Sequence, residues 1–470
     1  MLNFEFYNPA RILFGKGMEE QVGKRMAALG RRVLLVYGGG SIKRSGLYDT
    51  VLARLADAGV EVTELAGVQP NPRLGLVREG IRLCRENRLD AVLAVGGGSV
   101  IDTAKTVALG ACADGDVWDF FERLVPVEKA LPVGVVLTIP AAGSESSDSC
   151  VITKEEGLLK RSCAGEALIP RFAILNPAFT CTLPPYQTAC GATDILAHLM
   201  ERYFTRVDHV DLTDRLLEAT MRTVINYTPL ALERPDDYHI RAELMWAGTV
   251  AHNNLLDTGR IGDWASHQIE HELSALYDIA HGAGLAIVFP AWMKYVYRAD
   301  MSRFVQFAVR VFGVDLAFAE PEQIVLQGIR RLEAYLRSIG MPASTTAAFW
   351  RWRRNAAPKA LRDSSKSSIP GTSMPFMNWR CKANARKKTP WLRQGVFFVA
   401  RYSKRKARER ISSPGSVTIS SLSCVFLQPD GAMFRFIRPD NLAHPEFDLL
   451  VDRPPILTGH RTSQQKESLQ

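Results

Sequence analysis

The sequence predicts a mostly parallel α/β domain, followed by an all-helical domain and a poorly ordered basic tail. Three observations predict this order. Short apolar runs alternate with amphipathic stretches up to about residue 180, helical periodicity alone continues to about residue 340, and no period is visible after that point. The expected boundaries are residues 1–182, 183–343 and 344–470.

Five apolar runs of the first domain are predicted to form buried strands, at residues 33–38, 61–65, 91–97, 132–140 and 172–177. Amphipathic stretches such as LYDTVLARLADAG and LGLVREGIRLCRENR lie between them, with apolar residues three and four positions apart. Strands and helices that alternate in this way indicate βαβ units, which form a mostly parallel sheet covered by helices.

The second domain has helical periodicity without strands from about Leu183, as in TDRLLEATMRTVINYTPLAL and PEQIVLQGIRRLEAYLRSIG. From about Ser344 the period disappears, and YSKRKARERISSPGS is a charge run followed by Ser, Gly and Pro. Residues 1–350 carry a net charge of −6 and residues 351–470 one of +15, so the tail supplies the basic balance of the chain. That balance therefore does not indicate that the main body binds nucleic acid.

The composition is that of a globular chain, with 47% apolar and 23% charged residues among 470. No apolar run reaches the length of a transmembrane helix, so no membrane partner is expected. The first residues, MLNFEFYNPARILFGKG, lack the basic and apolar segments of a secretory signal. The eight cysteines form no CxxC pair, which suits a reducing compartment, and a cytoplasmic location is expected.

A glycine run at residues 96–99, GGGS, follows a predicted strand and opens the predicted helix SVIDTAKTVALGA. Backbone amides at a helix N-terminus favour an anion, and glycine lets the anion approach closely. Asp102 and Lys105 lie one and two turns into this helix. An ordinary tight turn would also explain the glycines, but the strand–GGGS–helix context favours phosphate binding and a Rossmann-like dinucleotide-binding domain.

A second GGGS, at residues 38–41, ends the first predicted strand. Many dinucleotide sites carry an acidic residue near this point, which holds the adenosine ribose diol. Here the run continues with a hydroxyl and two cations, Ser41, Lys43 and Arg44, and no acidic residue. These side chains suit a 2′-phosphate better than a bare diol, so NADP(H) is expected over NAD(H).

Histidines gather in one part of the second domain. Asp194 and His198 are four positions apart in GATDILAHLMERYF, which places both on one helix face. His267 and His271 repeat this spacing, and His281 begins a third segment after a short break. A carboxylate and several imidazoles from three segments can surround one divalent ion, and this donor set suits Fe²⁺ or Zn²⁺.

Single histidines are more often packed or surface residues than ligands. No role is therefore assigned to the remaining five: His209, His239, His252, His444 and His460.

Four motifs resemble the iron-containing alcohol dehydrogenases, and within them the branch of butanol dehydrogenases and broad aldehyde reductases. These motifs are GGGSVIDTAK, LTIPAAGSES, GATDILAHLMERYF and DWASHQIEHELSALYDIAHGAGLAIVFPAWMKY. The resemblance extends from residue 1 to about residue 343. It implies an NAD(P)-dependent oxidoreductase, and a homodimer as in many relatives.

The resemblance also assigns site residues. It implies that the metal ligands are Asp194, His198, His267 and His281, and that His271 lies near the nicotinamide without binding the metal. The implied coenzyme contacts are Gly38, Gly39, Ser41, Asn71, Gly97, Gly98, Ser99, Asp102, Thr138, Ser144 and Lys160. The YGGGS form of the first loop resembles that of the NADP-using relatives.

The expected reaction is the reversible reduction of a short-chain aldehyde to a primary alcohol. The metal would polarise the carbonyl oxygen, and the nicotinamide would deliver hydride to the carbonyl carbon. A proton would arrive through water or His271, because an imidazole has a pKa near the working pH. His271 could equally be a packing residue that orients the ligands. A glycerol-type dehydrogenase that uses NAD is the alternative reaction.

The tail departs from the family, whose closing helices it replaces. Either a frame change in the coding DNA or a genuine added module would explain the switch near Ser344. The chemistry remains encoded, because every site residue precedes this point. The helical domain would nevertheless lose packing partners, so an impaired enzyme whose basic tail binds nucleic acid is a further alternative.

Overall fold

The computed structural model describes residues 1–316 and 320–342, together with four short tail segments at 397–401, 423–427, 433–435 and 450–452. The chain separates into two compact units, Met1–Trp352 and Arg353–Gln470. Among the described residues, none of the helices combines the length and apolarity needed to cross a membrane.

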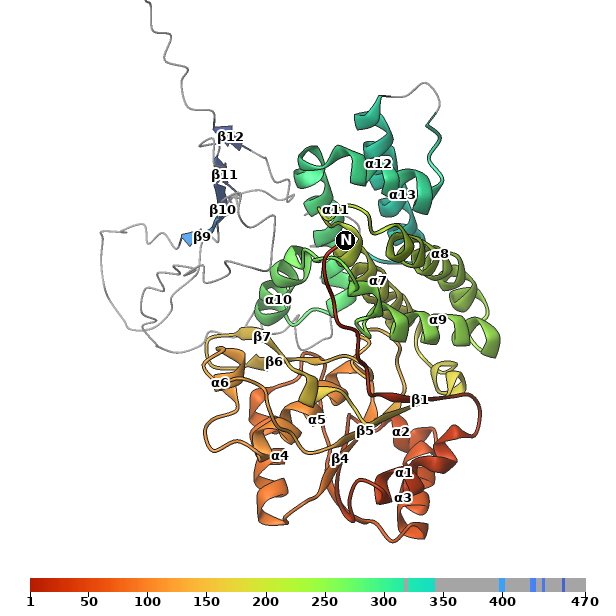
Figure 1. Ribbon diagram of the computed structural model, residues 1–470, viewed down its shortest axis with the longest axis vertical. Coiled ribbons are helices and arrows are strands. Elements are labelled where there is room, and N and C mark those ends of the chain that lie inside the picture. Colours follow the sequence, from red (N-terminus) through yellow and green to blue (C-terminus); the bar gives the residue numbers. More distant parts are fainter. Residues whose placement is uncertain (317–319, 343–396, 402–422, 428–432, 436–449, 453–470) are drawn as a thin grey trace, which may run out of the picture. The chain divides into compact units, whose positions relative to one another are not determined.

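A six-stranded parallel sheet forms the first part of unit one (Figure 1). Its order is β1-β8-β5-β4-β2-β3, and every neighbouring pair is parallel. The strands are β1 (Arg11–Phe14), β2 (Arg32–Tyr37), β3 (Glu61–Leu65), β4 (Ala91–Gly96), β5 (Val133–Leu137) and β8 (Phe172–Leu175). The parallel sheet and its five predicted strands are confirmed, and β1 is an additional edge strand.

Apolar side chains cover both faces of this sheet. Leu34 and Val36 of β2 pack in one buried cluster, and Val33 and Leu35 pack in another. Neighbouring residues of a strand point to opposite faces, so an unbroken apolar run fits a sheet that is buried on both sides. The helices of this part are α1 (Val22–Ala27), α2 (Ser41–Arg44), α3 (Leu47–Asp57), α4 (Leu74–Glu86), α5 (Gly98–Ala111) and α6 (Trp118–Phe121).

An antiparallel hairpin, which the sequence analysis did not predict, follows β5. It consists of β6 (Ser149–Lys154) and β7 (Leu159–Ala164), with Thr153 opposite Lys160. Polar and charged residues interrupt its apolar pattern, so neither strand stands out in the sequence. The hairpin matters for the site because it carries Lys160.

Between Pro185 and Ser338 the described residues, 185–316 and 320–338, form helices and no strand, as predicted (Figure 1). They are α7 (Pro185–Tyr203), α8 (Asp211–Glu233), α9 (Tyr238–Ala251), α10 (Ala265–Tyr277), α11 (His281–Val296), α12 (Met301–Phe312) and α13 (Pro321–Ser338). Helix α7 is the centre of this part, because almost every residue from Thr188 to Tyr203 is buried. The aromatic side chains of Phe204, Phe289 and Phe304 pack beside its C-terminal end.

Unit two contains one small antiparallel sheet in its described residues. Its order is β12-β11-β10-β9, formed by β9 (Phe397–Arg401), β10 (Ser423–Leu427), β11 (Met433–Arg435) and β12 (Leu450–Asp452). The rest of this unit, including most of the basic run RYSKRKARERISSPGS, lies outside the described residues. The poorly ordered tail therefore stays a prediction, and a tail that binds nucleic acid stays an alternative that was not favoured.

Candidate metal and coenzyme site

The carboxylate of Asp194 is the centre of the histidine cluster. Its Oδ1 atom lies 3.7 Å from Nδ1 of His198, 3.7 Å from Nε2 of His267 and 3.6 Å from Nε2 of His281. Helix α7 supplies Asp194 and His198, and α10 and α11 supply one histidine each. The structure therefore brings together the four residues that the sequence analysis expected around one ion.

Three polar atoms of this cluster have no hydrogen-bond partner among the described residues: Asp194 Oδ1, His198 Nδ1 and His267 Nε2. Their side chains are only 6–7% exposed, so water cannot freely satisfy them. Buried polar atoms without partners are rare in folded proteins. A bound cation would satisfy all three atoms at once.

The ends of α10 aim its histidines at α7. Trp264, in the left-handed region with φ 64°, precedes the helix, and the Asp263 carboxylate accepts a hydrogen bond of 2.9 Å from the Ala265 amide. At the other end, Asp278 is also left-handed, with φ 50°. The chain turns there and restarts as α11 at His281, so that His281 returns to face Asp194.

Two buried glutamates, which the sequence analysis missed, stand behind the histidines. Glu201 Oε1 accepts a hydrogen bond of 2.8 Å from Nδ1 of His267, and Glu270 Oε2 accepts one from Nδ1 of His281. Both glutamates are fully buried. Their spacing was a usable signal, because Glu201 lies three positions after His198 and Glu270 three after His267, on the same helix faces.

The charges of the cluster suit a divalent cation. Asp194, Glu201 and Glu270 bring three carboxylates, and Lys160 brings one ammonium group, with each residue at most 4% exposed. With ionised carboxylates and neutral imidazoles, the cluster carries two negative charges. Buried charges are stable only when they are paired, so this donor set fits one divalent metal ion.

The same negative charge shifts the pKa values of its members. Burial would lower the pKa of His267, but hydrogen bonds and charges of Asp194 and Glu201 outweigh it and raise that pKa to about 9. Burial would raise the pKa of Glu270, but His281, Lys160 and a hydrogen bond from Ser274 outweigh it and lower that pKa to about 2. The cluster therefore attracts a cation strongly.

His271 lies one turn after His267 on α10, with its ring centre 5.5 Å from that of His281. Together with Glu270 and His281 it forms a second group, whose ligand atoms lie within 4.8 Å of one another. The sequence analysis expected a pKa near neutrality. Desolvation and the charge of Lys160 instead lower the pKa of His271 well below its usual value. The imidazole is therefore neutral at neutral pH.

The predicted coenzyme residues gather where coenzymes bind in folds of this kind. Strands β2 and β4 are neighbours, with β3 next to β2 and β5 next to β4, so the order in which successive strands are added to the sheet reverses between β2 and β4. All of the predicted residues follow the carboxyl ends of these strands or lie on the hairpin: Gly38, Gly39, Ser41, Asn71, Gly97, Gly98, Ser99, Asp102, Thr138, Ser144 and Lys160.

Several of these residues also bind one another. Ser144 Oγ donates a hydrogen bond of 2.6 Å to Asp102 Oδ1, and the Val151 amide donates one of 3.0 Å to Oδ2. Both oxygens of Asp102 are thus engaged within the protein. Lys160 Nζ lies 2.9 Å from Asn71 Oδ1. Asp102 and Lys160 therefore fix the loops that surround the glycines.

The second glycine loop packs tightly against the chain after β5. A Cβ atom on Gly98 would lie 2.9 Å from the Cβ of Ala142, and one on Gly97 would lie 3.2 Å from the Cβ of Ile139. Larger side chains would push these two segments apart. The glycines are thus required for the close approach of the loop, in addition to any role in binding phosphate.

The first loop has an acidic neighbour that the sequence analysis did not foresee. Glu64 of β3 accepts hydrogen bonds of 2.6 Å from Tyr37 and 2.9 Å from Tyr48. The ammonium group of Lys43 lies 4.4 Å from the ring centre of Tyr48 and 5.1 Å from that of Tyr37. Glu64 lies on β3, the strand next to β2, so the residues that follow β2 in the sequence do not reveal it.

His252, to which no role was assigned, lies against the cluster. Its ring centre is 4.4 Å from that of His198, and Arg202 donates a hydrogen bond of 2.9 Å to its Nδ1. Its Nε2 lies 3.3 Å from the hydroxyl of Ser149 on the hairpin. His252 thus connects the helical part to the sheet part directly behind His198.

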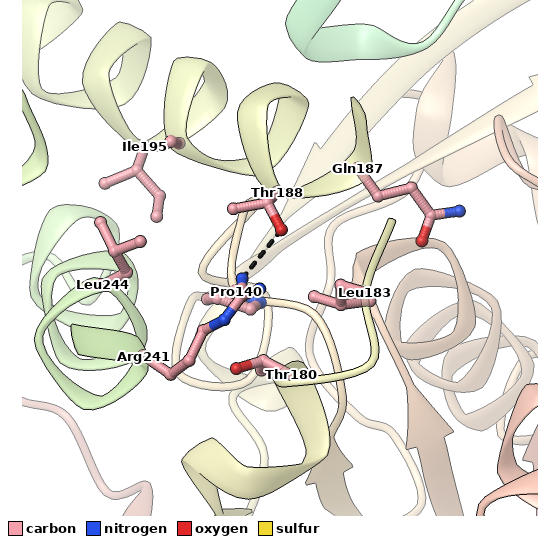
Figure 2. A pocket seen from close by; sticks show the side chains of 9 residues that line it. Pro140, Thr180, Leu183, Gln187, Thr188, Ile195, Arg241 and Leu244 are labelled. Carbon is pink, nitrogen blue, oxygen red and sulfur yellow. Dashed lines mark hydrogen bonds between the residues drawn. The ribbon is translucent and has the colours of Figure 1, made fainter. Parts of the chain in front are cut away.

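A small pocket lies beside α7, and no histidine is among the residues that line it (Figure 2). Arg241 of α9 reaches into it and donates a hydrogen bond of 2.8 Å to Thr188. Its volume of about 10 Å³ holds about one water molecule. The lining residues are Pro140, Thr180, Leu183, Gln187, Thr188, Ala192, Ile195, Arg241 and Leu244. None is a predicted site residue, so this pocket is separate from the candidate site.

Comparisons with known proteins agree with this geometry. The family model of the iron-containing alcohol dehydrogenase matches residues 9–177, and that of the C-terminal part of the Fe-containing alcohol dehydrogenase family matches residues 188–348. The crystal structure of NADH-dependent butanol dehydrogenase A from Thermotoga maritima is 44% identical, with a TM-score of 0.72, and the match covers 78% of this chain and 89% of that one.

Two curated relatives are similar over most of their length. The probable NADH-dependent butanol dehydrogenase 2 of Bacillus subtilis is 47% identical over 343 residues, which are 73% of this chain and 88% of the relative. The NADPH-dependent aldehyde reductase YqhD of Escherichia coli is 38% identical over 321 residues, which are 67% of this chain and 81% of the relative. The chain therefore belongs to the iron-containing alcohol dehydrogenase family, and it is an alcohol dehydrogenase that depends on a nicotinamide coenzyme.

Proposed function

We propose that the enzyme interconverts short-chain aldehydes and primary alcohols with NADP(H), using one divalent ion, Fe²⁺ or Zn²⁺, bound by Asp194, His198, His267 and His281. The observation that carries this proposal is the convergence of three side-chain nitrogens within 3.7 Å of Asp194 Oδ1. The printed names of the relatives, butanol dehydrogenases and an aldehyde reductase, support the substrate class.

The residues of the chain have separate tasks in this reaction. A divalent ion held by these four side chains supplies Lewis-acid polarisation of a carbonyl oxygen. The two glycine loops bind the pyrophosphate and orient the nicotinamide toward the histidine cluster. His271, which is neutral, can take up a proton at one ring nitrogen as it releases another from the second.

The two parts of unit one would divide this work. We propose that residues 1–182 bind the coenzyme and that residues 183–343 bind the metal and position the aldehyde. This division is supported by the family matches, which cover residues 9–177 and 188–348.

Metal analysis of the purified protein tests the proposal first. About one divalent ion per chain is expected, and its removal with a chelator should abolish oxidation of NADPH in the presence of butanal. Addition of Fe²⁺ or Zn²⁺ should restore activity and so identify the metal. Full activity of the metal-free protein would contradict the proposal.

The preference for NADP(H) rests on the hydroxyl of Ser41 and the cations of Lys43 and Arg44. NAD(H) is the rival, because Lys43 already lies over two tyrosine rings, Glu64 is beside them, and the butanol dehydrogenase relatives are named as NADH-dependent. Comparison of kcat/KM for NADPH and NADH separates the two. A higher value for NADH would overturn the preference.

We further propose that the enzyme is a homodimer. The N-terminal arm exposes a row of apolar side chains, in which Leu2 is 42%, Phe4 55% and Phe6 45% exposed. Edge strand β1 follows in the sequence. Exposed apolar arms and unpaired strand edges are usually covered by a partner. Light scattering should give twice the mass of the chain, and Phe4→Ser should shift it toward the monomer.

A further inference from the structure

We infer that Glu270 is a positioning residue that couples the coenzyme side of the cleft to the metal ligand His281, through Lys160. This inference rests on the proposed function, because it concerns the same metal and coenzyme. It adds a specific claim, namely that bound coenzyme and bound metal stabilise each other through one buried carboxylate.

The carboxylate of Glu270 is held rigidly. Its Oε2 atom accepts a hydrogen bond from Nδ1 of His281, and its Oε1 atom accepts one from the hydroxyl of Ser274. Gly284 of α11 packs directly on it, since a Cβ atom there would lie 2.6 Å from Glu270 Oε1. A fully buried carboxylate in this setting has no room to take another rotamer.

Lys160 connects this carboxylate to the sheet part. Its Nζ atom lies 3.6 Å from Glu270 Oε2 and 2.9 Å from Asn71 Oδ1. Asn71 in turn donates hydrogen bonds of 2.9 Å to Asp278 and 3.1 Å to the carbonyl of Ile279. Asp278 and Ile279 lie in the turn that leads into His281, so the contacts form a closed ring around that ligand.

The ring predicts a thermodynamic coupling. Lys160 and Asn71 come from the hairpin and from the loop after β3, where the coenzyme is proposed to bind. A coenzyme that binds to these two side chains stabilises the whole ring of contacts, and with it the position of Glu270 behind His281. Because coupling between two binding sites is reciprocal, bound coenzyme should slow release of the metal.

Glu201 provides a comparison within the same site. It backs His267 as Glu270 backs His281, but its other hydrogen bonds come from backbone amides, those of Trp264 at 2.8 Å and His267 at 3.0 Å. These partners belong to the helical part. Loss of Glu201 should therefore weaken metal binding without changing the coupling to coenzyme.

The experiment compares Glu270→Gln, Glu201→Gln and the control Glu272→Gln. Glu272 lies on the same helix, is 51% exposed and pairs with Arg161 next to Lys160. Release of bound Zn²⁺ to a colorimetric chelator is timed with and without saturating NADP⁺, and in parallel with NAD⁺. This readout does not depend on turnover.

For the wild type and Glu272→Gln, coenzyme should slow release several-fold. Both site variants should release metal about 10–100 times faster than the wild type, because the group behind each histidine loses its charge and one of its two acceptor oxygens. In Glu201→Gln the slowing by coenzyme should persist, whereas in Glu270→Gln it should disappear.

Three results would overturn the inference: no slowing by coenzyme in the wild type, release from Glu270→Gln as slow as from Glu272→Gln, or slowing that persists in Glu270→Gln. A wild type that binds no metal would instead refute the proposed function itself. If Glu270→Gln does not fold, Glu270→Asp decides. The aspartate keeps the negative charge near Lys160, but its shorter side chain no longer reaches Nδ1 of His281. This variant should therefore release metal faster than the wild type. Release at the wild-type rate would contradict the inference.

Discussion

An imidazole binds a metal only through a bare ring nitrogen, and a neighbouring acceptor decides which nitrogen is bare. Glu201 and Glu270 each accept a hydrogen bond from Nδ1, which leaves Nε2 of His267 and His281 facing Asp194. The convergence of Asp194, His198, His267 and His281 could be predicted from spacing and resemblance. The spacing of the two glutamates indicates that they share helix faces with His198 and His267, but only tertiary packing shows that they are buried and accept hydrogen bonds from ligands.

Replacement of His267 by alanine removes a ligand and leaves its acceptor, Glu201, buried without the imidazole. We expect metal content and kcat/KM to fall together, by more than the roughly hundredfold cost of losing an outer hydrogen-bond partner of a ligand. Metal analysis and an NADPH assay on one preparation measure both. His239→Ala is the matched control, since His239 is exposed and lies outside the cluster. A variant that keeps its metal and its turnover would contradict the ligand assignment.

The charge of Lys43 offers a residue-level test of coenzyme choice. If the enzyme prefers NADP(H), Lys43→Ala should lower kcat/KM for NADPH about tenfold or more, because a hydrogen bond to a charged group contributes about 1.5–3 kcal/mol. The value for NADH should change little. Glu64→Gln removes the acid beside Tyr37 and should raise the value for NADPH. Equal losses for both coenzymes in Lys43→Ala would show that Lys43 does not select between them.

At the scale of elements, the turn from α10 to α11 and the hairpin β6–β7 shape the site. The sequence predicted a short break before His281, at YDIAHG. It did not predict the hairpin, whose strands become recognisable only through their pairing and their contact with α5. Lys105 of α5 donates hydrogen bonds to the carbonyls of Ser147 and Ser149, and these hold the hairpin in place.

The tight packing of α5 against the chain after β5 makes Gly98 sensitive to substitution. Gly98→Ala would place a methyl group 2.9 Å from the Cβ of Ala142 and displace the loop that faces the coenzyme. We expect KM for the coenzyme to rise about 10- to 100-fold, because small displacements at a reacting site cost this much. Metal content should stay normal. Gly115→Ala, whose Cβ would meet only the end of the Asp119 side chain at 3.4 Å, is the control. A normal KM would show that the loop accommodates the added methyl group without moving away from the coenzyme.

Asp90 joins the start of β2 to the turn before β4 and makes the stability of the sheet part depend on pH. Hydrogen bonds from the Arg32 side chain and from backbone amides lower the pKa of Asp90 to about 2. The carboxyl group of Asp90 therefore binds a proton less tightly in the folded state than in the unfolded chain. The stabilisation that Asp90 provides is complete above about pH 4 and is lost as the pH falls toward 2.

Asp90 is partly exposed, so Asp90→Asn should lower the free energy of unfolding by only about 1 kcal/mol at pH 7. Urea unfolding at pH 7 and pH 3 measures the loss, which should shrink at the lower pH. Asp57→Asn, at an exposed ion pair, is the control.

At the scale of the whole molecule, the pattern of apolar residues predicted an element wherever that pattern reflects which faces of the element are buried. The unbroken apolar run of β2 follows from burial on both faces, and the period near 3.6 along α8 and α13 follows from one buried face. Contacts between distant segments, such as Glu64 with Tyr37 or Glu270 with Lys160, leave no such period. This is why the architecture and the convergence of the four proposed ligands could be predicted from the sequence, whereas the contacts that connect the two parts could not.

Deletion of the tail would show whether unit one folds and works without it. All of the site residues precede Ser344, and the buried clusters around α7 and on both faces of the sheet lie within Met1–Trp352. Deletion of residues 353–470 should therefore leave metal content, kcat/KM and melting temperature unchanged. It also removes most of the +15 charge of residues 351–470, so any retention on RNA should disappear with it. Calorimetry, metal analysis and an RNA filter assay on the full and shortened chains measure these effects. If the shortened chain has a lower melting temperature or loses its metal, the tail is a structural part of the enzyme. A frame change would then be the weaker explanation for the tail, and a genuine added module the stronger one.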